Sequence, residues 1–298
     1  MSGVALTAYL MGGLGNQMFQ YAAARALASR SDAALYLDTV TGFARDKVFR
    51  RTYELGSFPI EATPAGALRR ALLPADAVIR KVRRAAKPPI SARPWGEYLY
   101  EPTPAFSPAV AKHRIVRKTW MQGYWQDERY FADLRDCVRR ELTPRMPLDP
   151  GFRRAGDQME SQSSVAVGVR LFEEVPGASK AGVGGLTPIE FFNRAAIQLA
   201  ERVRDPVFYV FCTSKAPELE GLSLPGPVHF ITHDNGFSGS IRRLWLLTNC
   251  QHHILSNSSF YWWGAWLREA ANPGCQVIAS PLFPSPETTP SRWLSTAD

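Results

Sequence analysis

Residues 4–27 read VALTAYLMGGLGNQMFQYAAARAL, and this stretch determines the class of fold. Residues 4–11 are an apolar run of strand length, followed at once by the glycine-rich residues 12–16. Between residues 17 and 27, strong helix formers place apolar side chains at helical spacing. A second strand is expected at residues 33–37. The order strand, turn, helix, strand predicts an α/β domain with parallel strands.

The glycine turn is the first candidate site. Glycines between a strand end and a helix start let the backbone approach a ligand closely, and the N-terminus of a helix favours anions. The spacing does not fit the dinucleotide fingerprint, and no Lys-Ser or Lys-Thr pair makes it a phosphate-binding P-loop. The candidate ligand-side residues are Gly13, Gly15, Asn16 and Gln17. The alternative interpretation is a tight strand-to-helix turn with Asn16 as its cap.

The composition is that of an ordinary globular protein, with 45% apolar and 21% charged residues in a chain of 298. This length favours two domains or one large one. No apolar run reaches the roughly eighteen residues of a membrane span, and the N-terminus lacks the basic residues of a signal peptide, so we expect a cytoplasmic protein. The spacing of the four cysteines predicts free thiols in a reducing compartment: Cys137, Cys212, Cys250 and Cys275.

The chain is basic, because 35 Lys and Arg against 27 Asp and Glu leave a net charge of +8. Such a surplus suits an anionic partner: nucleic acid, an acidic membrane or a phosphorylated substrate. No RNA-binding signature is present, so nucleic acid is not expected. The basic helical stretch at residues 76–86, with Arg80, Lys81, Arg83 and Arg84, and the preceding Arg69-Arg70 have two interpretations. They are either a solvated helix face or a peripheral contact with anionic lipid at the inner face of the membrane.

The second half repeats the α/β pattern after a polar, proline-bearing stretch at residues 143–164. This stretch divides the chain into predicted domains of residues 1–150 and 151–298. Strand-like runs are expected at residues 165–170, 207–212, 228–232, 253–256 and 276–280. Two such arrays in tandem predict two nucleotide-binding-type domains that face each other across a cleft.

Three local patterns complete the structural expectations. Thr187, Pro188 and Glu190 have the spacing of a capping box before a helix. Five prolines within residues 87–104 predict an extended loop. Residues 128–140 are expected to be helical.

Arg170 is the second candidate site, because it follows a predicted strand at the edge of the sheet where ligands bind. A guanidinium there can hold a diphosphate and stabilise its charge as it leaves. Glu173 or Glu174 could orient that arginine or accept a proton from a hydroxyl. The alternative is a surface ion pair in a loop.

Residues 257–267 read NSSFYWWGAWL and form the third candidate. Asn257, Ser258 and Ser259 are good cap residues whose amides and hydroxyls could bind phosphate. We expect the three tryptophans that follow them to be buried packing.

Several kinds of chemistry lack support in this sequence. No D-x-D triplet is present to hold a nucleotide-bound divalent cation. His252 and His253 are adjacent on a predicted strand and would point to opposite faces, so no zinc site is expected. No G-x-S-x-G elbow supports serine hydrolysis.

Three segments together resemble the bacterial α-1,2-fucosyltransferases of glycosyltransferase family 11. Residues 11–22, MGGLGNQMFQYA, are similar to the family's N-terminal signature. Residues 123–126, GYWQ, with Tyr130 and Phe131 resemble a second block, and residues 257–267 resemble the C-terminal block. In order and spacing the resemblance covers about the whole chain.

The resemblance implies a GT-B fold and an inverting, metal-independent enzyme without a cofactor. Such an enzyme would transfer L-fucose from GDP-fucose to a galactoside hydroxyl in an α-1,2 linkage, during surface glycan synthesis on an acceptor that a lipid can carry. Arg170 would then bind the donor diphosphate, with Asn257, Ser258 and Ser259 lining the donor site. Glu173 would be the catalytic base, and residues 13–17 would lie at the cleft on the acceptor side.

The middle of the chain departs from the family pattern His-x-Arg-Arg-x-Asp. Residues 168–173 read GVRLFE, so Arg170 is retained and Glu173 replaces the Asp, whereas the His and the second Arg are lost. An Asp expected after Phe211 is also replaced, by Cys212. Two alternatives follow: another GDP-deoxysugar as donor, or a catalytically inactive relative that binds a nucleotide or a glycan.

Overall fold

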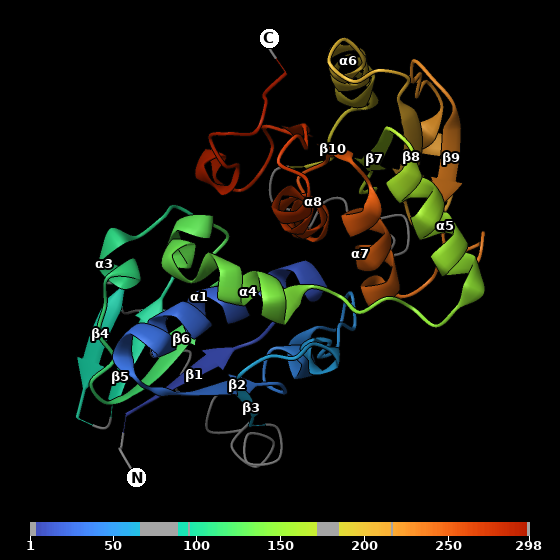
Figure 1. The fold of residues 1–298 in the computed structure, drawn as a ribbon. Helices are drawn as coiled ribbons and strands as arrows, with labels where there is room; N and C mark the ends of the chain where they lie inside the picture. Colours follow the sequence, from blue (N-terminus) through green and yellow to red (C-terminus); the bar gives the residue numbers. More distant parts are fainter. Residues whose placement is uncertain (1–3, 66–88, 95, 172–184, 216, 297–298) are drawn as a thin grey trace. The chain divides into compact units, whose positions relative to one another are not determined.

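The computed structural model of the protein describes residues 4–65, 89–94, 96–171, 185–215 and 217–296. The chain divides into two compact units, Met1–Leu142 and Thr143–Asp298 (Figure 1). Each unit contains one sheet and the helices that cover it, and each is described by itself. The boundary predicted at residue 150 lies at the first residue of a helix in the second unit.

The first unit is built on a six-stranded sheet in the order β3-β2-β1-β6-β5-β4. The strands are β1 (Ala5–Tyr9), β2 (Ala34–Asp38), β3 (Thr63–Pro64), β4 (Ile90–Arg93), β5 (Gly96–Tyr100) and β6 (Lys118–Gln122). Neighbouring strands are parallel except β4 and β5. Leu6 and Ala8 of β1 are buried because alternate residues of a strand share a face. The strand predicted from the opening sequence is therefore confirmed.

The extended loop predicted over residues 87–104 is wrong. Two strands lie within this range, and β5 is an inner strand of the sheet, paired with both β4 and β6. Pro94 and Pro102 flank β5 without interrupting it, and residues 97–99 are buried. The prolines in this range therefore mark the two ends of a strand, and they do not indicate that the strand is absent.

Among the described residues of the first unit, two helices of more than one turn and several shorter elements accompany the sheet. The helices of more than one turn are α1 (Leu14–Ser31), which packs on β1 and β2, and α4 (Arg135–Leu142). The hydroxyl of Tyr21 on α1 donates to the carboxylate of Glu141 on α4 at 2.5 Å in a buried contact. The expected helix over residues 128–140 is only partly present, since two 3₁₀ turns precede α4. The shorter elements are α3 (Pro108–Ala111) and 3₁₀ turns at Phe43–Arg45, Leu55–Ser57, Glu128–Tyr130 and Ala132–Leu134.

The second unit is built on a five-stranded parallel sheet in the order β11-β10-β7-β8-β9. The strands are β7 (Ser164–Gly168), β8 (Val207–Phe211), β9 (Val228–Ile231), β10 (His252–Leu255) and β11 (Val277–Ala279). Each lies within two residues of its predicted run, so the second α/β array is confirmed.

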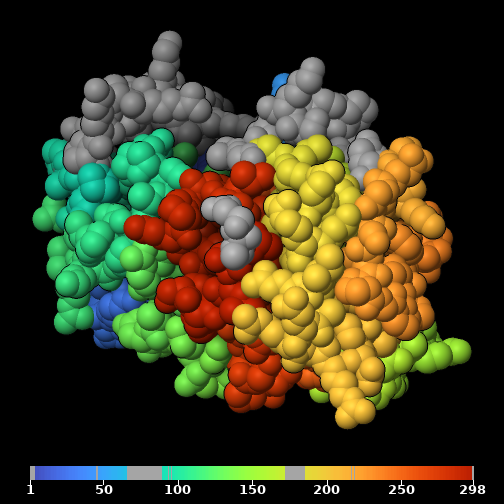
Figure 2. Space-filling view, turned by 90° about the horizontal axis from the view of Figure 1, so that it is seen from above, coloured from blue at the N-terminus to red at the C-terminus, as the bar shows by residue number. Residues whose placement is uncertain are grey.

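Helices cover both faces of the second sheet (Figure 1). One face carries α6 (Ile189–Ala200), and the other carries α5 (Pro150–Ser161), α7 (Ser240–Asn249) and α8 (Ser259–Ala271). The C-terminal segment lies beside α6 (Figure 2), where the Gln198 amide donates to the Ser295 carbonyl at 3.2 Å. Three tryptophans of α8 are fully buried, which confirms that they are packing residues: Trp262, Trp263 and Trp266. The four cysteines are free, as predicted.

The capping box predicted at Thr187 is wrong. Helix α6 begins at Ile189, and its N-cap Pro188 provides no side-chain capping bond. Thr187 is buried, and its hydroxyl lies 3.2 Å from Asn257 Oδ1 and 3.0 Å from Ser280 Oγ. Because Asn257 and Ser280 follow β10 and β11, Thr187 belongs to the polar edge of the sheet.

Candidate functional site

The candidate residues lie at the carboxyl edges of the two sheets. Parallel strands all end at the same edge, and ligands of open α/β folds bind there. In the first unit the glycine turn follows β1 and the GYWQ segment follows β6. In the second unit Arg170 follows β7 and Asn257 follows β10.

A buried glutamine of α1 holds the glycine turn at the first edge. Gln17 is fully buried and donates to the carbonyl oxygens of Gly12 and Thr52 at 3.0 and 2.8 Å. Its Oε1 accepts from the backbone N–H of Glu54 at 2.9 Å. Gly15 is buried in the first turn of the same helix. Gln17 therefore braces the turn and joins it to residues 52–54.

Asn16 joins the same turn to the loop after β6. Gly12 has a φ of 77°, and a Cβ atom there would lie 2.5 Å from Asn16 Nδ2, so only glycine fits. Helix α1 begins at Leu14 with Gly13 as its N-cap, so the interpretation of Asn16 as the cap is wrong. Asn16 Oδ1 instead accepts from Gln126 Nε2 at 2.8 Å.

Arg170 lies two residues beyond β7 and is half-buried. The N–H of Val169 donates to the carbonyl of Phe211 at 2.9 Å, so the pairing of β7 with β8 continues up to Arg170. This position agrees with the expectation that Arg170 ends a strand. Glu173 and Glu174 lie outside the described residues, and their role remains a prediction from the sequence.

Asn257 braces the second edge. Its Nδ2 donates to the carbonyl oxygens of Gly185 and Leu282 at 3.0 and 3.1 Å. Its Oδ1 lies within hydrogen-bond distance of the Thr187 hydroxyl. The amide thus connects the loops that precede α6 and follow β11 to the start of α8. We interpret Asn257 as a residue that shapes the site through these loops.

Ser258 and Ser259 stand at the N-terminus of α8. Ser258 is the N-cap and has extended backbone angles, and its side chain makes no capping bond. Its N–H donates to the Ser256 carbonyl at 2.7 Å. The first N–H groups of a helix have no partners within the helix and carry its positive dipole end. This end of α8 is suited to a phosphate group.

Arg243 is a buried cation at the second edge that sequence reasoning missed. It lies on α7 and is 6% exposed. Its Nη2 donates to the carbonyl of Cys212 at 2.8 Å and lies 3.4 Å from that of Ile231, at the ends of β8 and β9. Its Nη1 lies 2.6 Å from His233 Nε2. No carboxylate among the described residues pairs with it. The available signal was an arginine directly before the apolar run of residues 244–247 in this helix.

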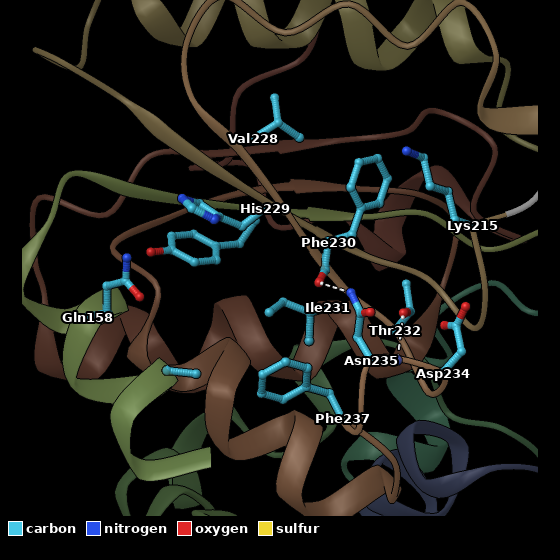
Figure 3. A pocket seen from close by; sticks show the side chains of 12 residues that line it. Gln158, Lys215, Val228, His229, Phe230, Ile231, Thr232, Asp234, Asn235 and Phe237 are labelled. Carbon is cyan, nitrogen blue, oxygen red and sulfur yellow. Dashed lines mark hydrogen bonds between the residues drawn. The ribbon is translucent and has the colours of Figure 1, made fainter. Parts of the chain in front are cut away.

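A hollow of about 470 Å³ lies beside the edge strand β9 (Figure 3). Tyr209 and His229 form part of its wall, and their rings stack with centroids 5.1 Å apart. The ammonium group of Lys215 lies 4.8 Å from the centroid of the Phe230 ring. Polar side chains after β9 also line the hollow: Thr232, Asp234 and Asn235. Its aromatic and polar groups suit a planar ring with hydrogen-bonding edges.

The adjacent histidines of β10 are neutral at physiological pH. Burial lowers the pKa of His253 to about 3 and that of His252 to about 4. His252 Nδ1 accepts from the N–H of Gln276 at 3.1 Å. Within the described ranges, no group of three or more His, Cys, Asp or Glu side chains could hold a metal ion. In the same part of the chain, no helix combines the length and the apolar character needed to cross a bilayer.

The chain matches the model of glycosyl transferase family 11 over residues 84–287, which is more than half of its length. It is 26% identical to an α-1,2-colitosyltransferase of Escherichia coli, over 97% of this chain and 98% of the relative. It is 24% identical to the O-antigen biosynthesis glycosyltransferase WbnK of Escherichia coli, over 91% of this chain and 92% of the relative.

The chain is also similar to solved structures. A complex of Arabidopsis thaliana FUT1 with GDP matches with a TM-score of 0.50 at 13% identity, over 93% of this chain and 70% of that one. The fucosyltransferase NodZ from Bradyrhizobium matches with a TM-score of 0.48 at 15% identity, over 89% and 93%. The two α/β units with parallel-rich sheets therefore have the fold class of GT-B glycosyltransferases, as expected.

Proposed function

The chain belongs to glycosyl transferase family 11, and from this premise we propose that it transfers L-fucose from GDP-fucose to a galactoside hydroxyl in an α-1,2 linkage. The product would be a surface glycan such as an O-antigen. The observation that carries the proposal is the family match over residues 84–287, which includes Arg170 and Asn257 at the carboxyl edge of the second sheet. GDP-colitose is the alternative donor, because one relative is named a colitosyltransferase.

We assign the donor diphosphate to the edge formed by β7 and β10. The guanidinium of Arg170 can hold two phosphate oxygens at once. The N-terminus of α8, beside Ser258 and Ser259, adds backbone N–H groups and the positive end of a helix dipole. Asn257 fixes the loops around this position. Positive charge and oriented N–H groups are what a leaving diphosphate requires.

We assign the guanine base to the hollow beside β9. This strand lies three positions from β10, and a spacing of about 4.8 Å per strand puts the two ends about 14 Å apart. An extended nucleoside diphosphate has a comparable length. The carboxylate of Asp234 can accept from the N–H groups of a guanine edge, while aromatic side chains contact the ring.

The proposed reaction is a direct displacement with inversion. The acceptor hydroxyl oxygen attacks the anomeric carbon, and the bond from that carbon to the GDP oxygen breaks. The electron pair of this bond goes to the diphosphate, where Arg170 stabilises the charge. The hydroxyl proton goes to a carboxylate, for which Glu173 is the candidate and Glu174 the substitute. Because the leaving group is good, positioning and charge stabilisation contribute more than the base.

Two further parts of the proposal concern metal and membrane. We propose that the enzyme needs no divalent cation, since Arg170 and the α8 N-terminus supply the positive charge. We also propose that the acceptor is a lipid-linked glycan and that the enzyme acts on it at the inner face of the membrane. The basic stretch at residues 76–86, which would contact anionic lipid, lies outside the described residues. Vesicle cosedimentation of wild type and a charge-neutralised variant tests this contact.

The test of the proposal is donor selectivity in the presence of EDTA. Purified protein is titrated with GDP-fucose, GDP-colitose, GDP-mannose and UDP-galactose, and release of GDP is then followed with and without methyl β-galactoside. We expect selective binding of one GDP-deoxysugar and GDP release that EDTA leaves unchanged. Loss of turnover with EDTA would contradict metal independence.

The same assay separates the alternatives. Preference for GDP-colitose over GDP-fucose would correct the donor but keep the reaction. GDP binding without turnover on any acceptor would favour the inactive binding relative, which the altered segment at residues 168–173 motivates. No preference for any GDP-sugar would contradict the proposal as a whole.

A further inference from the structure

We infer that Tyr124 is the platform on which a pyranose ring of the acceptor stacks, and that Glu101 is the residue that positions this platform. The inference rests on the proposed function, because it assumes that the acceptor is a glycan. It assigns a role to two residues at the carboxyl edge of the first sheet, at the ends of β5 and β6.

Tyr124 differs from the aromatic residues around it. Its side chain is 42% exposed, whereas Trp125 and Tyr130 are each 1% exposed and pack edge to face at 5.4 Å between ring centroids. The tyrosine is therefore presented to solvent by a loop whose other aromatic residues are anchored in the core. An exposed aromatic ring on an anchored loop at a ligand-binding edge is suited to contact a ligand.

Glu101 fixes the backbone of this loop. Its two carboxylate oxygens accept from the N–H of Tyr124 at 2.6 Å and from that of Trp125 at 2.9 Å. A Cβ atom on Gly123 would lie 2.4 Å from Glu101 Cβ, so glycine permits this close approach. Trp125 has a left-handed φ of 56°, which turns the chain sharply after Tyr124. The carboxylate thus holds a strained turn in one orientation.

Glu101 lies in a site that disfavours its charged form. Burial raises the pKa of this carboxyl, and the two backbone hydrogen bonds only partly offset the effect. A folded-state pKa above the unfolded value means that the charged form costs folding stability at neutral pH.

The groups around Tyr124 suit a sugar. The electron-rich face of an aromatic ring attracts the weakly positive C–H groups of a pyranose face. Two residues further on, the Nε2 group of Gln126 donates to Asn16 Oδ1. No described residue donates a hydrogen bond to the Oε1 atom of Gln126. A sugar hydroxyl could occupy that acceptor.

The first experiment compares Tyr124→Ala with Tyr124→Phe, with methyl β-galactoside as the acceptor probe and GDP-fucose as donor. Loss of the ring should raise the acceptor KM about tenfold, and Tyr124→Phe should stay within about twofold, because the ring and not the hydroxyl makes the contact. Acceptor-free hydrolysis of GDP-fucose should be unchanged in both variants. Tyr36→Ala is the matched control, since this tyrosine is 38% exposed on β2.

The second experiment tests the positioning role of Glu101 through pH. A glutamine can offer an oxygen to only one of the two N–H groups, so Glu101→Gln should raise the acceptor KM severalfold without changing donor hydrolysis. A protonated Glu101 has the same defect. The acceptor KM of the wild type should therefore rise as pH falls through the elevated pKa of Glu101, and Glu101→Gln should flatten this dependence.

The outcomes distinguish this inference from the proposed function. If the wild type transfers the sugar and Tyr124→Ala has the same acceptor KM, Tyr124 is not the platform. If Glu101→Gln keeps the pH dependence of the wild type, Glu101 does not position the platform. If the wild type transfers nothing, saturation-transfer NMR with methyl pyranosides decides. Binding that Tyr124→Ala abolishes and Tyr36→Ala retains supports the platform even though the proposed function has failed. Absence of pyranoside binding overturns both.

Discussion

The carboxyl edges of the two sheets differ in the groups that brace them. The first edge is held by neutral amides and a carboxylate: Gln17 braces the glycine turn, and Glu101 braces the loop after β6. The second edge carries guanidinium groups, with Arg170 after β7 and Arg243 between the ends of β8 and β9. Both sheets belong to α/β units, and the difference arises from side chains that the loops after the strands and the helices α1 and α7 bring to the edges.

This difference matches the charges of the two proposed substrates. A diphosphate carries negative charge and favours the guanidinium-rich edge, whereas a glycan acceptor is neutral and favours aromatic and amide groups. Arg51 adds a cation near Gly13 at the first edge, where its guanidinium also lies over the Phe49 ring at 5.2 Å. The contrast therefore predicts which variants change donor handling and which change the acceptor or the fold.

The largest expected effect follows replacement of Arg170 by alanine. If this guanidinium binds the buried diphosphate, its loss should cost about 2–5 kcal/mol of transition-state stabilisation. The value of kcat/KM should then fall by about 30- to 5,000-fold, and donor binding should weaken in titration with GDP-fucose. The acceptor KM should change much less.

Arg194→Ala is a suitable control for Arg170→Ala, since Arg194 is an exposed arginine on α6. Arg170→Lys should recover part of the activity, because an ammonium keeps the charge but loses the bidentate geometry. Activity of Arg170→Ala within tenfold of the wild type would remove this residue from the donor site. The assignment of the second edge to the donor would then no longer be supported by Arg170.

The next effect concerns stability of the second edge. Arg243→Met keeps much of the side-chain volume but leaves the Cys212 carbonyl without its donor and removes the contacts to Ile231 and His233. We expect a loss of about 2–4 kcal/mol in the free energy of unfolding, measured by urea denaturation. Arg204→Met, at a side chain 95% exposed, should stay within about 0.5 kcal/mol. Equal losses in both variants would contradict a bracing role.

Most of the fold was predictable from the sequence because strands and helices leave local patterns. The five strands of the second unit were found within two residues, since continuous apolar runs mark buried parallel strands. The strand β5 was missed because the prolines at its ends suggested a loop. Thr187 was assigned to a helix cap because the pattern around it is local, whereas its actual partners are Asn257 and Ser280.

The candidate site was predictable where a residue follows a strand that the sequence reveals. Arg170 was selected in this way, because strand ends mark the ligand edge, whereas Asn257 was selected as a cap residue before a helix; the functional roles of both remain proposals. Glu101 was missed with β5, since a residue cannot be placed at the end of a strand that is not predicted. Arg243 was missed for another reason: it reaches the edge from α7, and only tertiary packing brings it to the ends of β8 and β9.

The smallest expected effect is at the brace of the first edge. Gln17→Leu keeps the approximate size of a fully buried side chain but removes three hydrogen bonds to backbone groups of Gly12, Thr52 and Glu54. Unpaired buried backbone groups destabilise, so we expect a loss of about 1–3 kcal/mol in urea denaturation. The loss should be smaller than that of Arg243→Met because no charged donor is removed and the loop can move toward solvent. Gln158→Leu, on the exposed face of α5, should have little effect. A larger loss for Gln17→Leu than for Arg243→Met would mean that neutral amides brace their edge more strongly than the guanidinium does, and the proposed order of the two edges would be reversed.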